Sequence, residues 1–141
     1  MRASPRYLPE PSPCSRFNPP ESGYDPAALA FENLQVNEQM LGDGHLIDAC
    51  GEIDHMTTPL VADALRKATL DGHGSVVLDL TETTFIDSAG ISTLLNGLRR
   101  LTRLRRKLIV ICPPGPARRV FDVLGLVGTF QIVESLREVP L

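Results

Sequence analysis

The chain has 141 residues, of which 43% are hydrophobic and 22% are charged. This length and composition predict a single domain with a real hydrophobic core. No apolar stretch approaches the ~18 residues that a membrane span needs, and the polar, proline-broken N-terminus has no signal-peptide core, so we expect a cytoplasmic protein. The formal net charge of −3 argues against a general nucleic-acid binder, because such proteins usually carry a basic excess.

Proline is concentrated at the start of the chain. Seven of the 12 prolines fall within residues 1–33. Because proline fixes φ and removes a backbone donor, this density opposes both helix and sheet. The composition therefore predicts a disordered tail over residues 1–33 and a folded domain over residues 34–141.

The hydrophobic pattern after the tail predicts a hairpin followed by a helix. Apolar and polar residues alternate over residues 34–40, as they do in a half-buried strand. Glycine-rich turn residues at 42–44 separate this segment from a second strand over residues 45–50. Thr58 and Pro59 suit the N-cap and the first position of a helix, whose apolar residues recur at helical spacing over residues 61–68.

The second half of the chain alternates strands with helices. β-branched runs over residues 75–80 and 108–112 are typical of central strands covered on both faces. Amphipathic helices are predicted over residues 91–101 and 117–124, and a last strand over residues 130–133.

The predicted element order is β-β-α-β-α-β-α-β, with residues 81–86 as a linker. Strands that alternate with helices predict an α/β fold with a mostly parallel sheet. The first hairpin makes the sheet mixed, with about five strands and three main helices.

Asp87 and Ser88 are the residues to which the sequence points for function. A buried strand precedes them and a helix begins at them, which places them at the carboxyl end of the sheet, where α/β folds carry their sites. A phosphate on Ser88 would be tolerated there, because free N–H groups at a helix N-terminus offset part of its charge. The simpler interpretation, which spacing alone favours, is that Asp87 or Ser88 only caps the helix.

Four motifs occur in this order along the chain: GEIDH at 51–55, VVLDL at 76–80, FIDSAG at 85–90 and VFDVLGL at 120–126. Together they resemble the STAS domain of bacterial anti-sigma factor antagonists over residues 34–135. The resemblance implies the STAS fold for this region.

The resemblance also implies a phosphorylation switch at Ser88. In that family an anti-sigma factor that is also a serine kinase phosphorylates the matching serine, and a serine phosphatase reverses the reaction. The unphosphorylated antagonist binds the anti-sigma factor and releases the sigma factor. The implied partner-binding residues are Asp54, Asp87, Ser88, Ala89 and Gly90.

Two of these residues need further comment: Asp54 has a second interpretation, and Ala89 departs from the family pattern. Asp54 is equally well explained as a turn residue that caps the first helix. Ala89 stands where the family often has a second Ser or Thr, which leaves Ser88 as the target.

Two other function classes are alternatives. The first is a STAS scaffold or transporter-accessory module in which Ser88 is only a cap. The second is an enzyme, which we do not expect: residue 86 is Ile, so Ser88 is not in a G-x-S-x-G elbow, and the sequence has no glycine-rich phosphate-binding motif. No cofactor, metal, membrane or direct nucleic-acid partner is expected.

Two further features of the sequence are weaker indications of function. Residues 99–107 contain six basic residues, which could contact an acidic partner or nucleic acid, although a solvated helix end matched to the helix dipole is the simpler interpretation. Cys50 and Cys112 both follow predicted strands, and two buried thiols are favoured over a redox-sensitive disulfide between them.

Overall fold

The computed structural model describes residues 33–140, so the predicted tail lies, apart from Asn33, outside the described residues. The strands are β1 (Leu34–Leu41), β2 (Gly44–Ile53), β3 (Val76–Asp79), β4 (Thr83–Ile86), β5 (Leu108–Ile111) and β6 (Gln131–Val133). The helices are α2 (Thr58–Leu70), α3 (Ser88–Arg103), α4 (Pro116–Val123) and the short 3-10 helix η2 (Leu136–Glu138).

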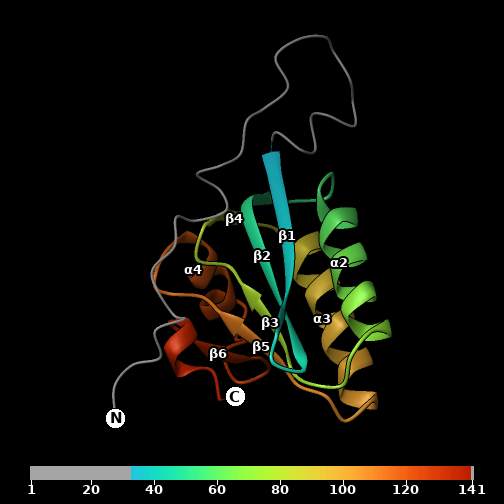
Figure 1. The fold of residues 1–141 in the computed structure, drawn as a ribbon. Coiled ribbons are helices and arrows are strands. Elements are labelled where there is room, and N and C mark those ends of the chain that lie inside the picture. The colour runs from blue at the N-terminus through green and yellow to red at the C-terminus, as the bar shows by residue number, and fades with distance from the viewer. Residues whose placement is uncertain (1–32, 141) are drawn as a thin grey trace, which may run out of the picture.

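The strands form one mixed sheet in the order β1-β2-β3-β5-β6, and β4 pairs with β2 beyond the end of β3 (Figure 1). β1 and β2 pair antiparallel, whereas the other described pairs are parallel. The predicted hairpin and the mostly parallel α/β fold are therefore confirmed.

The linker predicted over residues 81–86 is wrong, because its last four residues form β4. β2 is ten residues long and β3 only four, so the end of β2 has an edge that β3 does not cover. Residues 83–86 pair with that edge after a shift in register between Gly51 and Glu52. A strand of four residues is too short to show a periodicity, and its partner strand decides its conformation.

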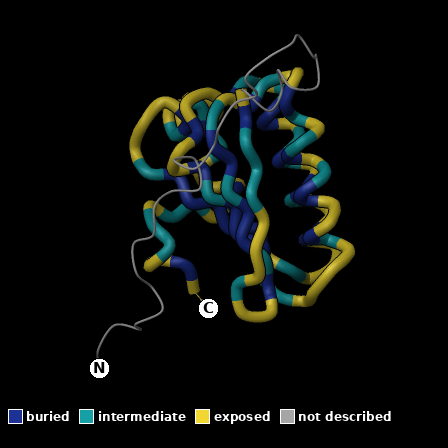
Figure 2. Tube along the Cα trace, turned by 45° about the horizontal axis from the view of Figure 1, so that its top comes forward, coloured by how far each residue is buried: buried dark blue, intermediate teal, exposed yellow. Residues whose placement is uncertain are grey.

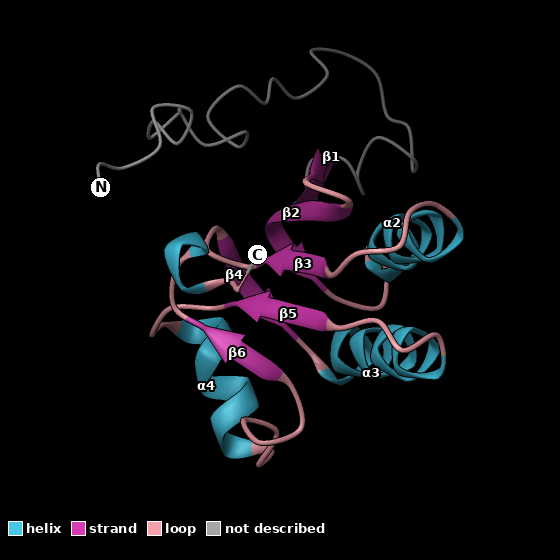
Figure 3. Ribbon diagram, turned by 60° about the horizontal axis from the view of Figure 1, so that its bottom comes forward, coloured by secondary structure: helices cyan, strands magenta, loops and turns pink. Residues whose placement is uncertain are grey.

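The helices and the sheet enclose the larger of two clusters of buried side chains (Figures 2 and 3). All three main helices contribute to it, through Val61, Ala64, Leu65, Ala68, Ile91, Leu94, Leu101, Ala117 and Phe121. On the opposite face of the sheet, Val139 packs with side chains of β2, β3 and β5. The central strands are thus covered on both faces, as their β-branched runs predict. Within residues 33–140 no helix has the length and apolar character to cross a membrane.

Candidate functional site

Ser88 is the first residue of α3, and Asp87 is the N-cap of that helix. The Oδ1 atom of Asp87 accepts a hydrogen bond from the backbone N–H of Gly90 at 2.9 Å. Ser88 is exposed, and its hydroxyl makes no hydrogen bond to another residue of the described range. Asp87 is therefore the residue that caps α3, and the Ser88 hydroxyl remains available at the surface.

Gly90 fixes the position of this helix start against the sheet. A Cβ atom at position 90 would lie 2.7 Å from Cγ1 of Ile86 and 2.8 Å from Cγ2 of Ile53. The backbone N–H of Asp87 also donates to the carbonyl of Ile53 at 3.1 Å. Gly90 is buried. Because it has no side chain, α3 can begin close to the ends of β2 and β4.

Asp54 organises the turn between β2 and α2. Its Oδ1 atom accepts hydrogen bonds from the backbone N–H groups of Met56 at 2.9 Å and Thr57 at 3.1 Å. The predicted turn role of Asp54 is therefore confirmed, but its side chain does not cap α2.

The helix cap differs from the prediction. α2 begins one residue earlier than predicted, with Thr57 rather than Thr58 at the N-cap position. The Thr57 hydroxyl does not cap the helix; it donates to the carbonyl of Glu52 at 2.8 Å. The Asp54 carboxylate and the carbonyl of Glu52 hold Thr57 instead, through contacts between residues close in the chain that a simple capping pattern does not contain.

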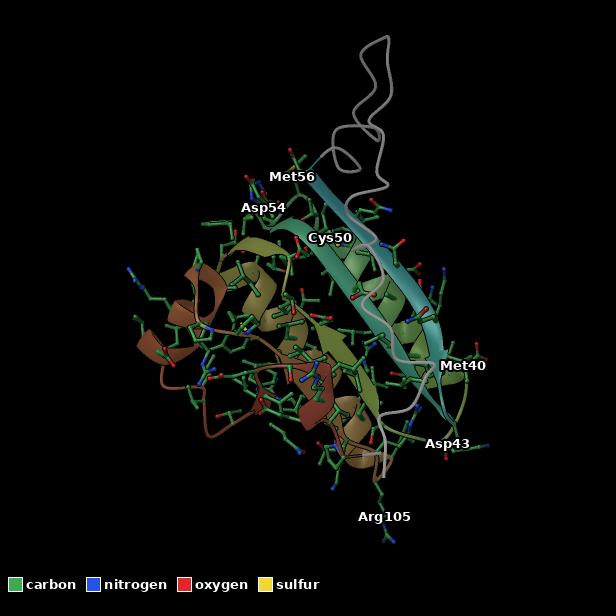
Figure 4. The ribbon with its side chains drawn as sticks, turned by 60° about the vertical axis from the view of Figure 1, so that its left-hand side comes forward. Met40, Asp43, Cys50, Asp54, Met56 and Arg105 are labelled. Carbon is green, nitrogen blue, oxygen red and sulfur yellow. The ribbon has the colours of Figure 1, made fainter. Side chains whose placement is uncertain are left out.

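The Asp54 turn and the start of α3 lie at one end of the sheet. Ile53 of β2 pairs with Ile86 of β4, so that Asp54 and Asp87 directly follow two paired residues. Figure 4 shows Asp54 and Met56 together at this end of β2. The structure thus brings Asp54 to the same end as residues 87–90.

Two large apolar side chains are exposed at this end, which the sequence analysis does not predict. Phe85 is 47% exposed and Met56 is 59% exposed. Phe85 precedes the buried Ile86 in β4, and recognising this segment as a strand would have been the signal, because successive strand side chains point to opposite faces.

The two segments that lead into α2 and α3 are acidic. We define the Ser88 end as residues 52–56 and 82–88, which contain Glu52, Asp54, Glu82 and Asp87 but no Lys or Arg. Glu52 and Glu82 are exposed. A phosphate on Ser88 would add about −2 to this surface at neutral pH.

The two cysteines that follow predicted strands do not pair with each other. Cys112 is a free, buried thiol. Burial raises the pKa of this thiol to about 11, which disfavours the reactive thiolate. A Cys50–Cys112 disulfide is therefore absent. Cys50 is itself disulfide-bonded, so the prediction of two buried thiols is confirmed for Cys112 and wrong for Cys50. The described part of the chain also contains no group of three or more His, Cys, Asp and Glu that could hold a metal ion.

The basic run has one member with a structural role. The Arg106 guanidinium donates to the carbonyls of Gly74, Ala68 and Thr69 at 2.8, 3.0 and 3.2 Å. Five other basic residues of the run are exposed, as the prediction of a solvated helix end requires, whereas Arg106 holds the end of α2.

Residues 38–139 match the family model of the STAS domain. The anti-sigma-B factor antagonist of Listeria monocytogenes is 28% identical over 103 residues, which are 72% of this chain and 88% of that protein.

Solved structures show the same fold. An anti-sigma factor antagonist from Mycobacterium paratuberculosis superimposes with a TM-score of 0.66 at 22% identity, over 76% of this chain and 91% of that one. The antagonist SpoIIAA in its unphosphorylated form gives a TM-score of 0.63 at 21% identity, over 74% and 91%. Bacillus SpoIIAA in its phosphorylated form gives 0.56 at 20% identity, over 74% and 94%. Since the family match spans most of the chain and the fold agrees with it, the chain belongs to the STAS domain family.

Proposed function

We propose that this protein is an anti-sigma factor antagonist that is switched by phosphorylation of Ser88. The unphosphorylated form binds an anti-sigma factor with serine kinase activity and so frees a sigma factor. Phosphorylation of Ser88 prevents this binding, and a serine phosphatase restores it. We place this cycle in the cytoplasm, without a cofactor and without direct contact to nucleic acid or membrane.

The observation that carries the proposal is the free hydroxyl of Ser88. Asp87 accepts the capping hydrogen bond, so Ser88 is exposed at the start of α3 without a capping role. Two relatives support it: the Listeria protein is named for antagonising an anti-sigma factor, and SpoIIAA has been solved both without and with its phosphate.

The proposed contact surface is built from Asp54 and residues 87–90. Asp54 and Asp87 each hold a turn by accepting hydrogen bonds from backbone N–H groups, and the two turns directly follow the paired residues Ile53 and Ile86. Gly90 acts from within the fold, whereas Asp54, Asp87, Ser88 and Ala89 face the partner.

A phosphate at this surface would switch binding without refolding the domain. The N-terminus of α3 accommodates negative charge, so the domain itself loses little. At an interface, however, like charges in contact cost several kcal/mol. At about 1.4 kcal/mol per tenfold change, this weakens binding on the order of a hundredfold.

The second candidate is a STAS scaffold or transporter-accessory module without a phosphoswitch. In that case Ser88 would have only a structural role. The capping bond made by Asp87 favours the antagonist over this alternative, because Ser88 has no structural hydrogen bond to explain it.

The test is a comparative affinity capture from an extract of the host bacterium. The baits are Ser88→Ala, which cannot be phosphorylated, Ser88→Glu, which adds one negative charge, and Ser92→Ala, a matched control at another exposed serine of α3. Mass spectrometry identifies the captured proteins. We expect Ser88→Ala and Ser92→Ala to retain a serine kinase that Ser88→Glu loses.

The captured kinase is then incubated with the purified protein and ATP. Phosphate should appear on Ser88 in the wild type and in Ser92→Ala, and not in Ser88→Ala. If all three baits capture the same proteins and no phosphate is transferred to Ser88, the scaffold function takes first place.

A further inference from the structure

The two ends of α3 adjoin segments of opposite charge. The Ser88 end contains four carboxylates and neither Lys nor Arg. We define the basic end as residues 99–107, and its exposed cations are Arg99, Arg100, Arg103, Arg105 and Lys107. None of these five forms an ion pair with another described residue. The positive charge of the basic end is therefore not compensated by ion pairs within the described part of the chain.

Each end also exposes large apolar side chains. Met56 and Phe85 lie at the Ser88 end, and Leu104, which is 52% exposed, lies within the basic end. Leu70, the last residue of α2, is 73% exposed. Arg106 ties the end of α2 to the basic end through the carbonyls of residues 68 and 69. Apolar side chains framed by charge are the composition of a protein interface.

The two ends cannot meet within one molecule. α3 has 16 residues, which at 1.5 Å per residue separates its ends by about 24 Å. Figure 4 shows Asp54 and Arg105 at opposite ends of the domain. A complementary contact between the two ends therefore requires two molecules.

We propose that the basic end binds the Ser88 end of a second copy of this chain. Five exposed cations would face four carboxylates, with Leu70 and Leu104 against Met56 and Phe85. The helix dipole has the opposite sense, but it amounts to only about half a charge at each end. The net charge of −3 gives little overall repulsion between copies.

This contact joins two different surfaces, so each copy keeps one end unoccupied. Such a head-to-tail arrangement does not close on itself unless the rotation happens to complete a ring. The protein should therefore form chains whose mean length grows with concentration rather than a closed dimer.

Phosphorylation would favour this self-association, a step that rests on the proposed modification of Ser88. The phosphate adds about −2 to the acidic surface that the basic end would bind. The same modification would thus weaken the anti-sigma contact and strengthen the contact between copies. Ser88→Glu adds one charge and should tighten self-association about two- to fivefold, as one exposed ion pair does.

The first measurement is sedimentation velocity of the full chain from micromolar to near-millimolar concentration. We expect the mean mass to rise continuously at low salt and to fall back to the monomer at high salt, because salt screens exposed charges. Ser88→Glu should shift the rise to lower concentration. A wild type that stays monomeric at every concentration in low salt overturns the proposal.

The second measurement uses two complementary double variants. Arg99→Glu with Arg103→Glu removes most of the positive charge of the basic end, and Glu52→Lys with Glu82→Lys cancels the negative charge of the Ser88 end. Each variant alone should be monomeric, because each lacks one of the two surfaces. Their equimolar mixture should form a complex of one copy each that does not grow further, because each variant retains one intact surface.

Two results of the mixing experiment contradict the proposal. Either the variants self-associate as the wild type does, or their mixture forms no complex although circular dichroism shows both folded. Neither result bears on capture of the kinase by Ser88→Ala, so failure of self-association and failure of the antagonist function are distinguishable. Arg106 is left unchanged because it holds the fold.

Discussion

Gly90 of α3 packs directly against Ile53 of β2, so closely that a Cβ atom at position 90 would lie 2.8 Å from Cγ2 of Ile53. The same position also meets Cγ1 of Ile86, at 2.7 Å. This contact sets the distance between α3 and the sheet, and with it the place of Ser88 relative to the Asp54 turn.

Gly90→Ala should therefore destabilise the domain. Two buried isoleucines must move to admit one methyl group, and overpacking of this kind costs about 1–3 kcal/mol. Urea denaturation measures the loss. Gly128→Ala is the matched control, because a Cβ at position 128 meets no atom within 4 Å; equal stability of the two variants would contradict the proposed role of Gly90.

The substitutions Asp54→Ala and Asp54→Asn should change the stability of the domain by different amounts. Asp54→Ala removes the acceptor for two backbone N–H groups and should cost about 1 kcal/mol of stability. Asp54→Asn keeps an oxygen at the same place and should retain most of it. Thermal unfolding measures both variants.

The Asn variant then separates the turn role of Asp54 from its proposed partner role. If the carboxylate charge contacts the anti-sigma factor, Asp54→Asn should lose affinity for the captured kinase while remaining as stable as the wild type. If affinity is unchanged, Asp54 acts through the turn alone.

Arg106→Ala should destabilise the domain by about 1.5–3 kcal/mol, because a charged donor to partly buried carbonyls is lost. Three carbonyls of residues 68, 69 and 74 would lose their partner. Arg106→Lys should not restore stability, since one ammonium group cannot reproduce the planar arrangement of donors of the guanidinium. Arg103→Ala, at an exposed neighbour, should stay within about 0.5 kcal/mol of the wild type in the same denaturation experiment.

Asp48 makes the stability of the domain depend on pH. It faces Asp79 at paired positions of β2 and β3. Burial, together with the charge of Asp79 and a hydrogen bond to it, raises the pKa of Asp48 to about 7. The folded protein therefore holds this proton more tightly than the unfolded chain, whose ordinary value is 3.8.

The direction of the pH effect follows because the pKa of Asp48 is higher in the folded protein than in the unfolded chain. The stabilising contribution is fully present below the ordinary pKa and is lost as the pH rises through about 7. Asp48→Asn should remove most of this dependence and stabilise the domain above pH 7 by about 1–2 kcal/mol, because solvent reaches part of the pair and screens it. Denaturation from pH 4 to pH 8 measures it, with the exposed Asp43→Asn as control; an unchanged slope in Asp48→Asn would contradict the assignment.

Periodicity made most of the fold predictable from the sequence. The apolar residues of α2 and α3 recur at helical spacing, and the β-branched runs around Val77 and Ile109 match strands buried on both faces. Helix 117–124 and the strand ending at Val133 also lie within one or two residues of α4 and β6. These features are local, so the sequence carries them directly.

The site was predictable in part. Asp87 and Ser88 stand between a strand and a helix, and the sequence alone places both at the carboxyl end of the sheet. It leaves open which of the two caps the helix, because both residue types suit an N-cap. The orientation of the Asp87 carboxylate toward Gly90 settles the capping role.

Other features arise only from tertiary contacts. β4 is a strand because the end of β2 offers an open edge. Arg106 differs from its basic neighbours because it donates to the carbonyls of residues 68 and 69, which are 38 and 37 residues away in the chain. The pKa of Asp48 depends on Asp79, 31 positions further along the chain but opposite it in the sheet. The sequence by itself determined the elements and their order, since these follow from residues close in the chain. Only the tertiary structure decided the strand partners, the role of Arg106 and the pKa of Asp48, since these depend on which distant residues meet.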